Sequence, residues 1–285
     1  MTGIRKAPSE GSSSGSRNAG ALPPGSTAPL EPVLEHTVAV EVIPRLVGAH
    51  RHAVSSSAGH WQAPAGAVEE LAALSLSAEH DAASTFVLRF VRRGIPVEDI
   101  SLGLLGPAAR RLGEQWVDDD RNIAEVTLGL YRLHEALRTL GTVVPPVAKR
   151  SGSAHRALLV PVPGEGHIFG AAVLGDFFRR AGWEVSGSAP ASVEELREWV
   201  MAEPFDAVGL SLATESRLST TRACIQAVRN SSCNPEVLIF VGGRLFDAQP
   251  ELAASLPADW VSTDARLAVR EATLRLAQGV GVPMA

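Results

Sequence analysis

The second half of the chain alternates between two kinds of segment, and this alternation restricts the folds it can adopt. Five short apolar runs separate longer stretches with helical spacing: "ALLVPV", "WEVSG", "DAVGLSL", "EVLIFVGG" and "DWVST". Runs of this length and composition are typical of strands, and strands that are joined through helices run parallel. The pattern therefore predicts a five-stranded parallel sheet with helices on both faces.

The segments between and after these runs predict the helices of that layered fold. They cover 168–182, 192–204, 219–230, 248–256 and 265–279. Because crossovers between parallel strands are right-handed, we expect an α/β domain of the flavodoxin-like or Rossmann-like kind across residues 156–285.

The preceding region, residues 31–142, has helical apolar spacing throughout and predicts a small helical bundle. In this region Ser77 is an expected N-cap, and Pro107 is expected to disturb its helix. The expected helices cover 34–50, 77–93, 96–116 and 121–141. The last of them has one apolar stripe, made of Ile123, Val126, Leu130, Leu133, Leu137 and Leu140.

Two breaks in composition bound these regions. Residues 1–30 are rich in Ser, Gly, Pro and Ala, and they carry too little apolar surface to offset the entropy lost on ordering. We expect a disordered tail there. Residues 143–155 contain two adjacent prolines followed by small polar residues, which is typical of a linker.

Composition excludes several classes of protein. A formal charge of -5 and a pI near 5.9 give no overall basic field, so direct sequence-specific DNA binding is not expected. No apolar run is long enough to cross a membrane, and no signal peptide is recognisable. The two cysteines, Cys224 and Cys233, fit neither a zinc site nor a disulfide framework. We expect a cytoplasmic protein.

Three loops of unusual composition follow strands of the predicted sheet. They are Gly164–His167, Ser211–Thr214 and the pair Gly242–Gly243. Ligands of open parallel sheets bind outside the carboxyl ends of the strands, where these loops meet. Small residues there let a bulky ligand approach the backbone and expose donors for a phosphate.

His167 has two possible roles in the first of these loops. An isolated loop histidine often only caps a helix or faces solvent. However, Glu165 stands two residues before it and could hold one ring nitrogen, as carboxylates do for histidines that bind metals. No second His or Cys lies nearby at zinc spacing, so a metal bound by protein ligands alone is not expected. This favours a metal whose other ligands come from a macrocycle.

The spacing of these residues resembles the cobalamin-binding domain family. Its Asp-x-His-x-x-Gly motif corresponds to Glu165, His167 and Gly170, and the later loops correspond to its Ser-x-Leu or Ser-x-Thr and Gly-Gly motifs. The resemblance implies that His167 is the lower cobalt ligand and that Glu165 orients it. It also implies a slot for the nucleotide tail of cobalamin, lined by Ser211, Ala213, Gly242 and Gly243. This chain departs from the motif by Glu at 165 and by Ala213 in the Leu position.

The helical region resembles the cap that precedes such domains and covers the upper face of the corrin ring. "LGEQW", ending at Trp116, is similar to a cap segment of light-sensing cobalamin repressors, although core packing is the other reading of Trp116. Those repressors carry a Glu-His pair where this chain has Val126 and Thr127, so an upper histidine ligand from that helix is not expected. His36, His50 and His52 are weaker candidates for that face.

Residues 36 to 280 resemble most closely the AerR/PpaA-type antirepressors of photosynthesis gene expression. The segments "EVIPRLVGAHR", "WVDDDRNIAEVTLGLYRLHEALRTLG" and "VPGEGHIFGAAVLGDFFRRAGWEV" carry this likeness. It implies a non-enzymatic regulator that senses cobalamin, and hence light, and that binds a CrtJ/PpsR-type transcriptional repressor. Two alternatives remain open: a corrinoid carrier for methyl transfer, and a haem-binding redox sensor related to the C-terminal domain of AppA-type proteins.

Overall fold

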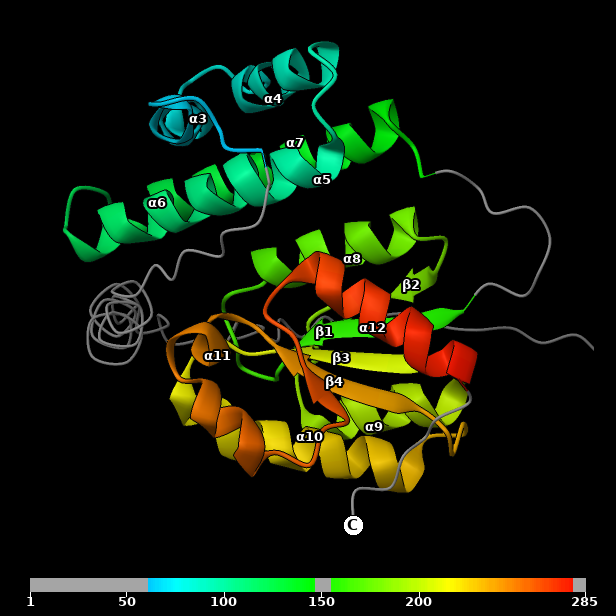
Figure 1. Cartoon of the computed structure of the whole chain (residues 1–285). Coiled ribbons are helices and arrows are strands. Elements are labelled where there is room, and N and C mark those ends of the chain that lie inside the picture. The colour runs from blue at the N-terminus through cyan, green and yellow to red at the C-terminus, as the bar shows by residue number, and fades with distance from the viewer. Residues whose placement is uncertain (1–60, 147–154, 279–285) are drawn as a thin grey trace, which may run out of the picture.

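A computed structural model describes residues 61–146 and 155–278, which form a helical layer above a three-layered α/β domain (Figure 1). This architecture confirms the expected fold class. Several expectations fall outside the described residues: the tail 1–30, the helix 34–50, the histidines His36, His50 and His52, and the linker between 147 and 154.

All five expected strands are present and run parallel in one sheet. Their order is β2-β1-β3-β4-β5, which is the flavodoxin-like order. Strands are added on one side of β1 first and then on its other side, so the switch point of the sheet lies between β1 and β3. The three central strands are almost continuously buried, as expected where helices cover both faces. The strands are β1 (Arg156–Pro161), β2 (Glu184–Ser186), β3 (Ala207–Ser211), β4 (Leu238–Gly242) and β5 (Trp260–Val261).

Helices cover both faces of the sheet. In Figure 1, α8 (Phe169–Arg180) and α12 (Ala265–Gln278) lie on one face, and α9 (Val193–Ala202) and α10 (Leu218–Ser231) lie on the other. The expectation of an α-helix over 248–256 is wrong, because most of this segment is a 3₁₀-helix. The short α11 (Arg244–Ala248) is followed by a 3₁₀-helix that begins at Pro250 and ends at Ser255. A 3₁₀-helix has three residues per turn, so side chains three positions apart lie directly above one another. They form a narrower face than the side chains of an α-helix.

The helical layer, called the cap below, is built in two tiers (Figure 1). The outer tier holds α3 and α4, and the inner tier holds α6 and α7, which lie next to α8. The cap helices are α3 (Ala67–Leu76), α4 (Ala82–Arg92), α5 (Val97–Ile100), a π-helical turn (Ser101–Leu105), α6 (Gly106–Val117) and α7 (Ile123–Val143).

Ser77 does not begin a helix, which corrects the sequence-based expectation. It is the C-cap of α3, where its extended backbone ends the helix and its N–H donates to the Leu74 carbonyl. The next helix begins after Asp81. Ser is compatible with either end of a helix, and the low amphipathicity of the residues before it concealed α3 in the sequence.

Pro107 disturbs its helix as expected. The preceding turn, Ser101–Leu105, is π-helical, and Pro107 then occupies the first turn of α6. A proline has no N–H and its ring crowds the carbonyl four residues earlier, so a widened turn before it relieves the clash.

The α7 stripe faces the cap interior along most of its length. A capping box of Asn122 and Glu125 begins the helix. Val126, Leu133, Leu137 and Leu140 are buried and Leu130 is partly buried, whereas Ile123 in the first turn is 43% exposed. The expected stripe is therefore confirmed except at Ile123.

The cap and the α/β domain share one hydrophobic core. Phe169, Val173 and Phe177 of α8 pack in the same cluster as the cap residues of α3 to α7. Arg266 of α12 adds an ion pair with Asp99 of α5. Two further clusters lie between the sheet and its helices, one on each face of the sheet.

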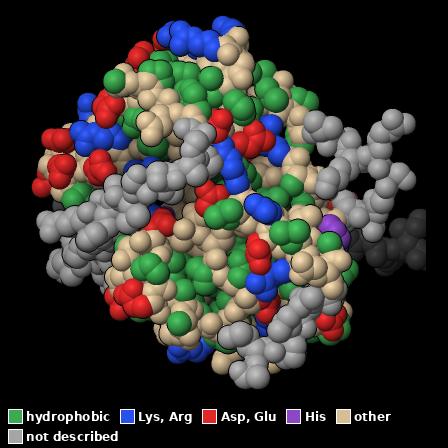
Figure 2. All heavy atoms as spheres, viewed as in Figure 1, with side chains coloured by type: hydrophobic (Ala, Val, Ile, Leu, Met, Phe, Trp, Pro, Cys, Tyr) green, Lys and Arg blue, Asp and Glu red, His purple; other side chains and the backbone are tan. Residues whose placement is uncertain are grey.

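The exposed surface is mixed in charge. On the face shown in Figure 2, basic and acidic side chains are interspersed over both layers, and no continuous basic surface is seen there. None of the described helices combines the length and the apolar character that crossing a membrane requires.

Candidate cofactor site at the carboxyl edge of the sheet

The three loops singled out in the sequence meet at one edge of the sheet. Pro161, Ser211 and Gly242 are direct neighbours across the ends of β1, β3 and β4. The hydrogen-bond ladder extends one residue further, because the Val162 N–H donates to the Ser211 carbonyl at 3.0 Å. The loops that follow these strand ends are therefore fixed relative to one another by the sheet.

Glu165 and His167 form the central pair of this edge. Glu165 Oε1 lies 2.5 Å from His167 Nδ1 and accepts the His167 backbone N–H at 3.0 Å. The carboxylate side chain is only 2% exposed, whereas the imidazole is 34% exposed. The structure thus brings together the two residues that the sequence analysis paired.

This contact fixes the chemistry of the imidazole. When Nδ1 donates its proton to a carboxylate, Nε2 keeps a lone pair and can act as a metal ligand. Gly166 directly precedes this histidine and Gly170 follows it by three residues, and a Cβ built on either one meets nothing within 4 Å. The loop therefore offers one orientated nitrogen ligand and open space beside it, which fits a bulky metal-bearing macrocycle.

Glu165 remains ionised in spite of its burial. Burial alone would raise the pKa of this carboxyl group, but hydrogen bonds from His167 and Ala213, together with the charge of His167 when its imidazole is protonated, lower the pKa to about 2. A carboxylate that stays charged is the stronger acceptor for the imidazole N–H.

The β3 loop supplies the remaining partners of Glu165. Oε2 accepts the backbone N–H of Ala213 at 2.9 Å and lies 3.4 Å from the Thr214 hydroxyl. The longer arm of Glu, compared with the Asp of the motif, reaches both loops at once. Thr214 was not predicted, although it stands in the loop "SLAT" whose composition marked this edge.

Gly242 and Gly243 allow neighbouring backbones to approach closely. A Cβ on Gly242 would lie 2.3 Å from the Ser262 carbonyl oxygen, and one on Gly243 would lie 2.2 Å from that of Leu212. Gly243 also has a φ of +110°. These two glycines are thus required by the packing of the loops. Their role in a tail slot with Ser211 and Ala213 stays a prediction.

Trp116 lies inside the cap. Its residue is 7% exposed and packs in the core cluster of α3 to α8. Val126 is buried in the same cluster, whereas Thr127 is exposed and its hydroxyl donates to the Ile123 carbonyl. Core packing therefore accounts for Trp116, and its contact with a cofactor stays a prediction.

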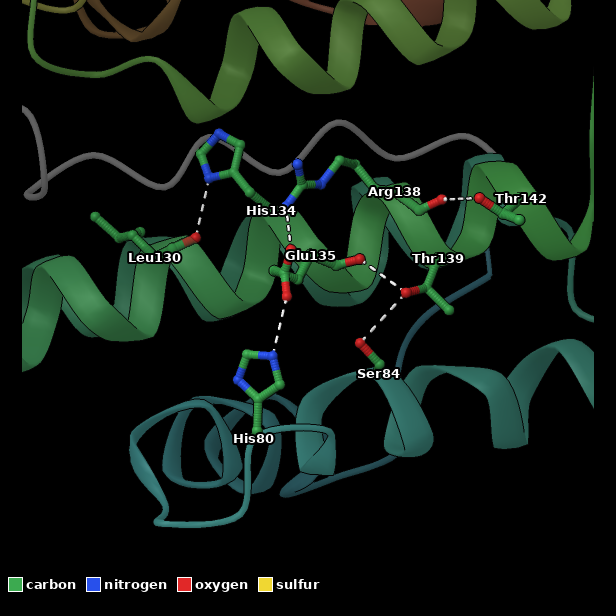
Figure 3. A network of polar contacts seen from close by, with 8 residues as sticks. All are labelled: His80, Ser84, Leu130, His134, Glu135, Arg138, Thr139 and Thr142. Carbon is green, nitrogen blue, oxygen red and sulfur yellow. Dashed lines mark hydrogen bonds and ion pairs between the residues drawn. The ribbon is translucent and has the colours of Figure 1, made fainter.

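His134 is a cap residue near the site that the sequence analysis missed. Its ring packs edge-to-face against Phe169, two residues after His167, with the ring centroids 4.8 Å apart. Its Nδ1 lies 2.9 Å from the Leu130 carbonyl. Figure 3 shows His134 on the opposite side of α7 from His80, which pairs with Glu135. No sequence signal marks it, because the contact depends on how the cap meets α8.

Within the ranges 61–146 and 155–278, no group of three or more His, Cys, Asp or Glu side chains could hold a metal ion.

Comparison with known proteins agrees with this geometry. Residues 155–272 match the family model described as B12 binding domain. An uncharacterised 20.5 kDa protein from the bchF-crtJ intergenic region of Rhodobacter capsulatus is 27% identical over 180 residues, which are 63% of this chain and 93% of that protein.

A solved structure shares the fold. The monomethylamine corrinoid protein of Methanosarcina barkeri superposes with a TM-score of 0.59 and 14% identity, over 74% of this chain and 98% of that one. The cap and the α/β domain therefore occur together in another protein. Residues 155–272 are thus similar in sequence to the B12 binding domain model, and the chain shares its fold with that corrinoid protein.

Proposed function

We propose that this protein binds cobalamin and that Nε2 of His167 would be a ligand of its cobalt. The observation that carries the proposal is the Glu165–His167 pair, in which Nδ1 is held by a buried carboxylate and Nε2 is left available. The match of residues 155–272 to the B12 binding domain supports the choice of cofactor.

The chain's own residues would act as follows. Glu165 fixes the tautomer of His167, and Ala213 and Thr214 hold the carboxylate in place. Gly166 and Gly170 leave room for the ring beside the histidine. Cobalamin, when bound, would supply a cobalt centre that responds to light and redox state.

We further propose that the protein is a regulator and not an enzyme: an antirepressor that binds a CrtJ/PpsR-type repressor of photosynthesis genes. Two observations support this. The chain resembles the AerR/PpaA-type antirepressors, and its relative in Rhodobacter capsulatus is named for the region between bchF and crtJ. A protein with a net charge of -5 would control DNA through such a partner rather than by direct contact.

The regulatory role is tested by titrating a fluorescent CrtJ/PpsR-type repressor with the cobalamin-loaded protein, in darkness and after illumination. We expect binding that depends on cobalamin and that releases the repressor from its promoter DNA. His167→Ala is the matched control and should lose the effect. Equal repressor binding by apo-protein, loaded protein and His167→Ala would contradict a cobalamin-controlled antirepressor.

A corrinoid carrier is the second candidate, because the cap and α/β domain also occur together in the monomethylamine corrinoid protein. A carrier would transfer a methyl group between a donor and a thiol acceptor in a single-turnover assay with the loaded protein. An antirepressor would not. The two roles thus give opposite results in that assay.

A further inference from the structure

Arg217 lies at the same edge of the sheet and has no part in the contacts described above. It ends the short 3₁₀-helix Glu215–Arg217 after the β3 loop and is the N-cap residue of α10. Its guanidinium covers Gly164 in the β1 loop: a Cβ on Gly164 would lie 2.9 Å from Cζ and 3.0 and 3.1 Å from the two terminal nitrogens. These nearly equal distances place the flat face of the guanidinium over this glycine.

Gly164 is therefore constrained twice. Its φ of +77° favours glycine, and a side chain would also collide with the guanidinium. Because Gly164 directly precedes Glu165, the cation is held against the loop that carries His167.

No anion neutralises Arg217 among the described residues. Its guanidinium has neither an ion pair nor a hydrogen bond there, although it is half-buried. The buried carboxylate of Glu165 is already used by His167, Ala213 and Thr214. Glu215, two residues earlier, is exposed and makes no ion pair with it in the described part of the chain.

The position of Arg217 is also unfavourable for α10. The N-terminus of a helix carries a partial positive charge, so a cation there costs stability, and the Arg217 side chain makes no capping hydrogen bond. The guanidinium and the helix terminus together form a positive site beside the loops of the candidate cofactor site. A planar guanidinium group can donate two parallel hydrogen bonds to two oxygens of one phosphate. Helix N-termini also favour phosphate.

We propose that Arg217 binds the phosphodiester in the nucleotide tail of cobalamin. This inference rests on the proposed cobalamin binding and assigns a residue to it. The peripheral side chains of the corrin ring are neutral amides. The phosphodiester of the nucleotide tail is therefore the only anionic group among the side chains of cobalamin. An anion at Arg217 would neutralise the half-buried guanidinium.

The experiment measures the affinities of the full-length protein for cobinamide and for cobinamide phosphate, by spectral titration. Neither probe has the nucleoside, so the two differ only by the phosphate. We expect the wild-type protein to bind cobinamide phosphate about ten- to a hundredfold more tightly, as charge-assisted hydrogen bonds allow. Arg217→Met should abolish this preference while keeping the affinity for cobinamide itself. Arg217→Lys, which keeps the charge but not the planar pair of donors, should retain part of it.

Arg222→Met is the matched control, because Arg222 is on the same helix and donates to the Ser255 carbonyl instead. It should keep the full preference for phosphate. A preference that survives in Arg217→Met overturns the inference. So does an equal loss of affinity for both probes, which would mean that Arg217 only supports the Gly164 loop. If the wild type binds neither these probes nor cobalamin, the proposed function fails as well.

Discussion

Glu165 shows how much a single residue contributes at this edge. Its carboxylate is almost fully buried, yet it accepts hydrogen bonds from two loops and stays charged. Removing its charge while keeping its shape should therefore have a measurable effect on the protein without any cofactor.

We expect Glu165→Gln to lower the free energy of unfolding by about 1–3 kcal/mol, because a neutral amide accepts at one atom only and leaves donors unpaired. Urea unfolding of the apo-protein measures this. Glu236→Gln, at an exposed position, is the control and should unfold like the wild type. An unchanged midpoint for Glu165→Gln would contradict the network.

Cys224 provides a pH-dependent prediction. Burial raises the pKa of its thiol to about 11, from an ordinary value of 9.0. The unfolded thiol loses its proton above pH 9 and the folded one does not, so the unfolded state binds fewer protons between pH 9 and 11. Stability should be fully present below pH 9 and should decrease as the pH rises towards 11. Cys224→Ala should remove that part of the slope in urea unfolding measured across this range. An unchanged slope would refute the assignment.

At this scale the sequence predicted part of the site. The spacing of Glu165 and His167 is local, so a motif can reveal it. Thr214 contacts Glu165, Arg217 lies over Gly164 and His134 packs on Phe169 only because the sheet and the cap bring distant segments together. No local pattern records such contacts.

At the scale of elements, the strands were predicted closely because each is a short apolar run bounded by turn residues. Helix ends were harder. Ser77 has a side chain suited to an N-cap, but its backbone is extended and closes α3 instead. The choice between the two ends depends on the packing of α3 against α6 and α7, which the local sequence does not contain.

Gly170, in the first turn of α8, gives a prediction about an element. A Cβ there meets nothing within 4 Å, and alanine is the better helix former. Gly170→Ala should therefore raise the stability of the apo-protein by about 0.5–1 kcal/mol. The same methyl group would occupy space beside His167 and should weaken corrinoid binding.

Thermal unfolding and a spectral titration measure the two effects separately. Gly243→Ala is the contrasting variant, since its Cβ collides with the Leu212 carbonyl oxygen and its φ is +110°. It should destabilise the apo-protein strongly. If Gly170→Ala left corrinoid affinity unchanged, the open space at Gly170 would have no role in the site.

At the scale of the whole molecule, the sequence predicted two regions but not how they meet. An apolar stripe shows that a helix is covered, and it does not show by what. The structure answers this with a core that α8 shares with the cap through Phe169, Val173 and Phe177.

A shared core should make the two regions unfold together. We expect one transition in urea, with the same midpoint by circular dichroism and by tryptophan fluorescence. Leu133→Ala, at a fully buried cap position, should lower the free energy of unfolding by about 2–5 kcal/mol and shift both signals equally. Two separate transitions, with only one moved by the substitution, would show that the cap and the α/β domain are independent.

The central claim is a cobalt ligand at His167, and one measurement tests it most directly. The absorption spectrum of the protein is recorded after incubation with hydroxocobalamin and desalting, for the wild type and for His167→Ala. The account predicts corrin bands that are retained by the wild type and are lost or shifted in the variant. If no corrin remained bound, while haemin gave a Soret band that depended on His167, the cobalamin account would be wrong and the haem-sensor alternative would replace it.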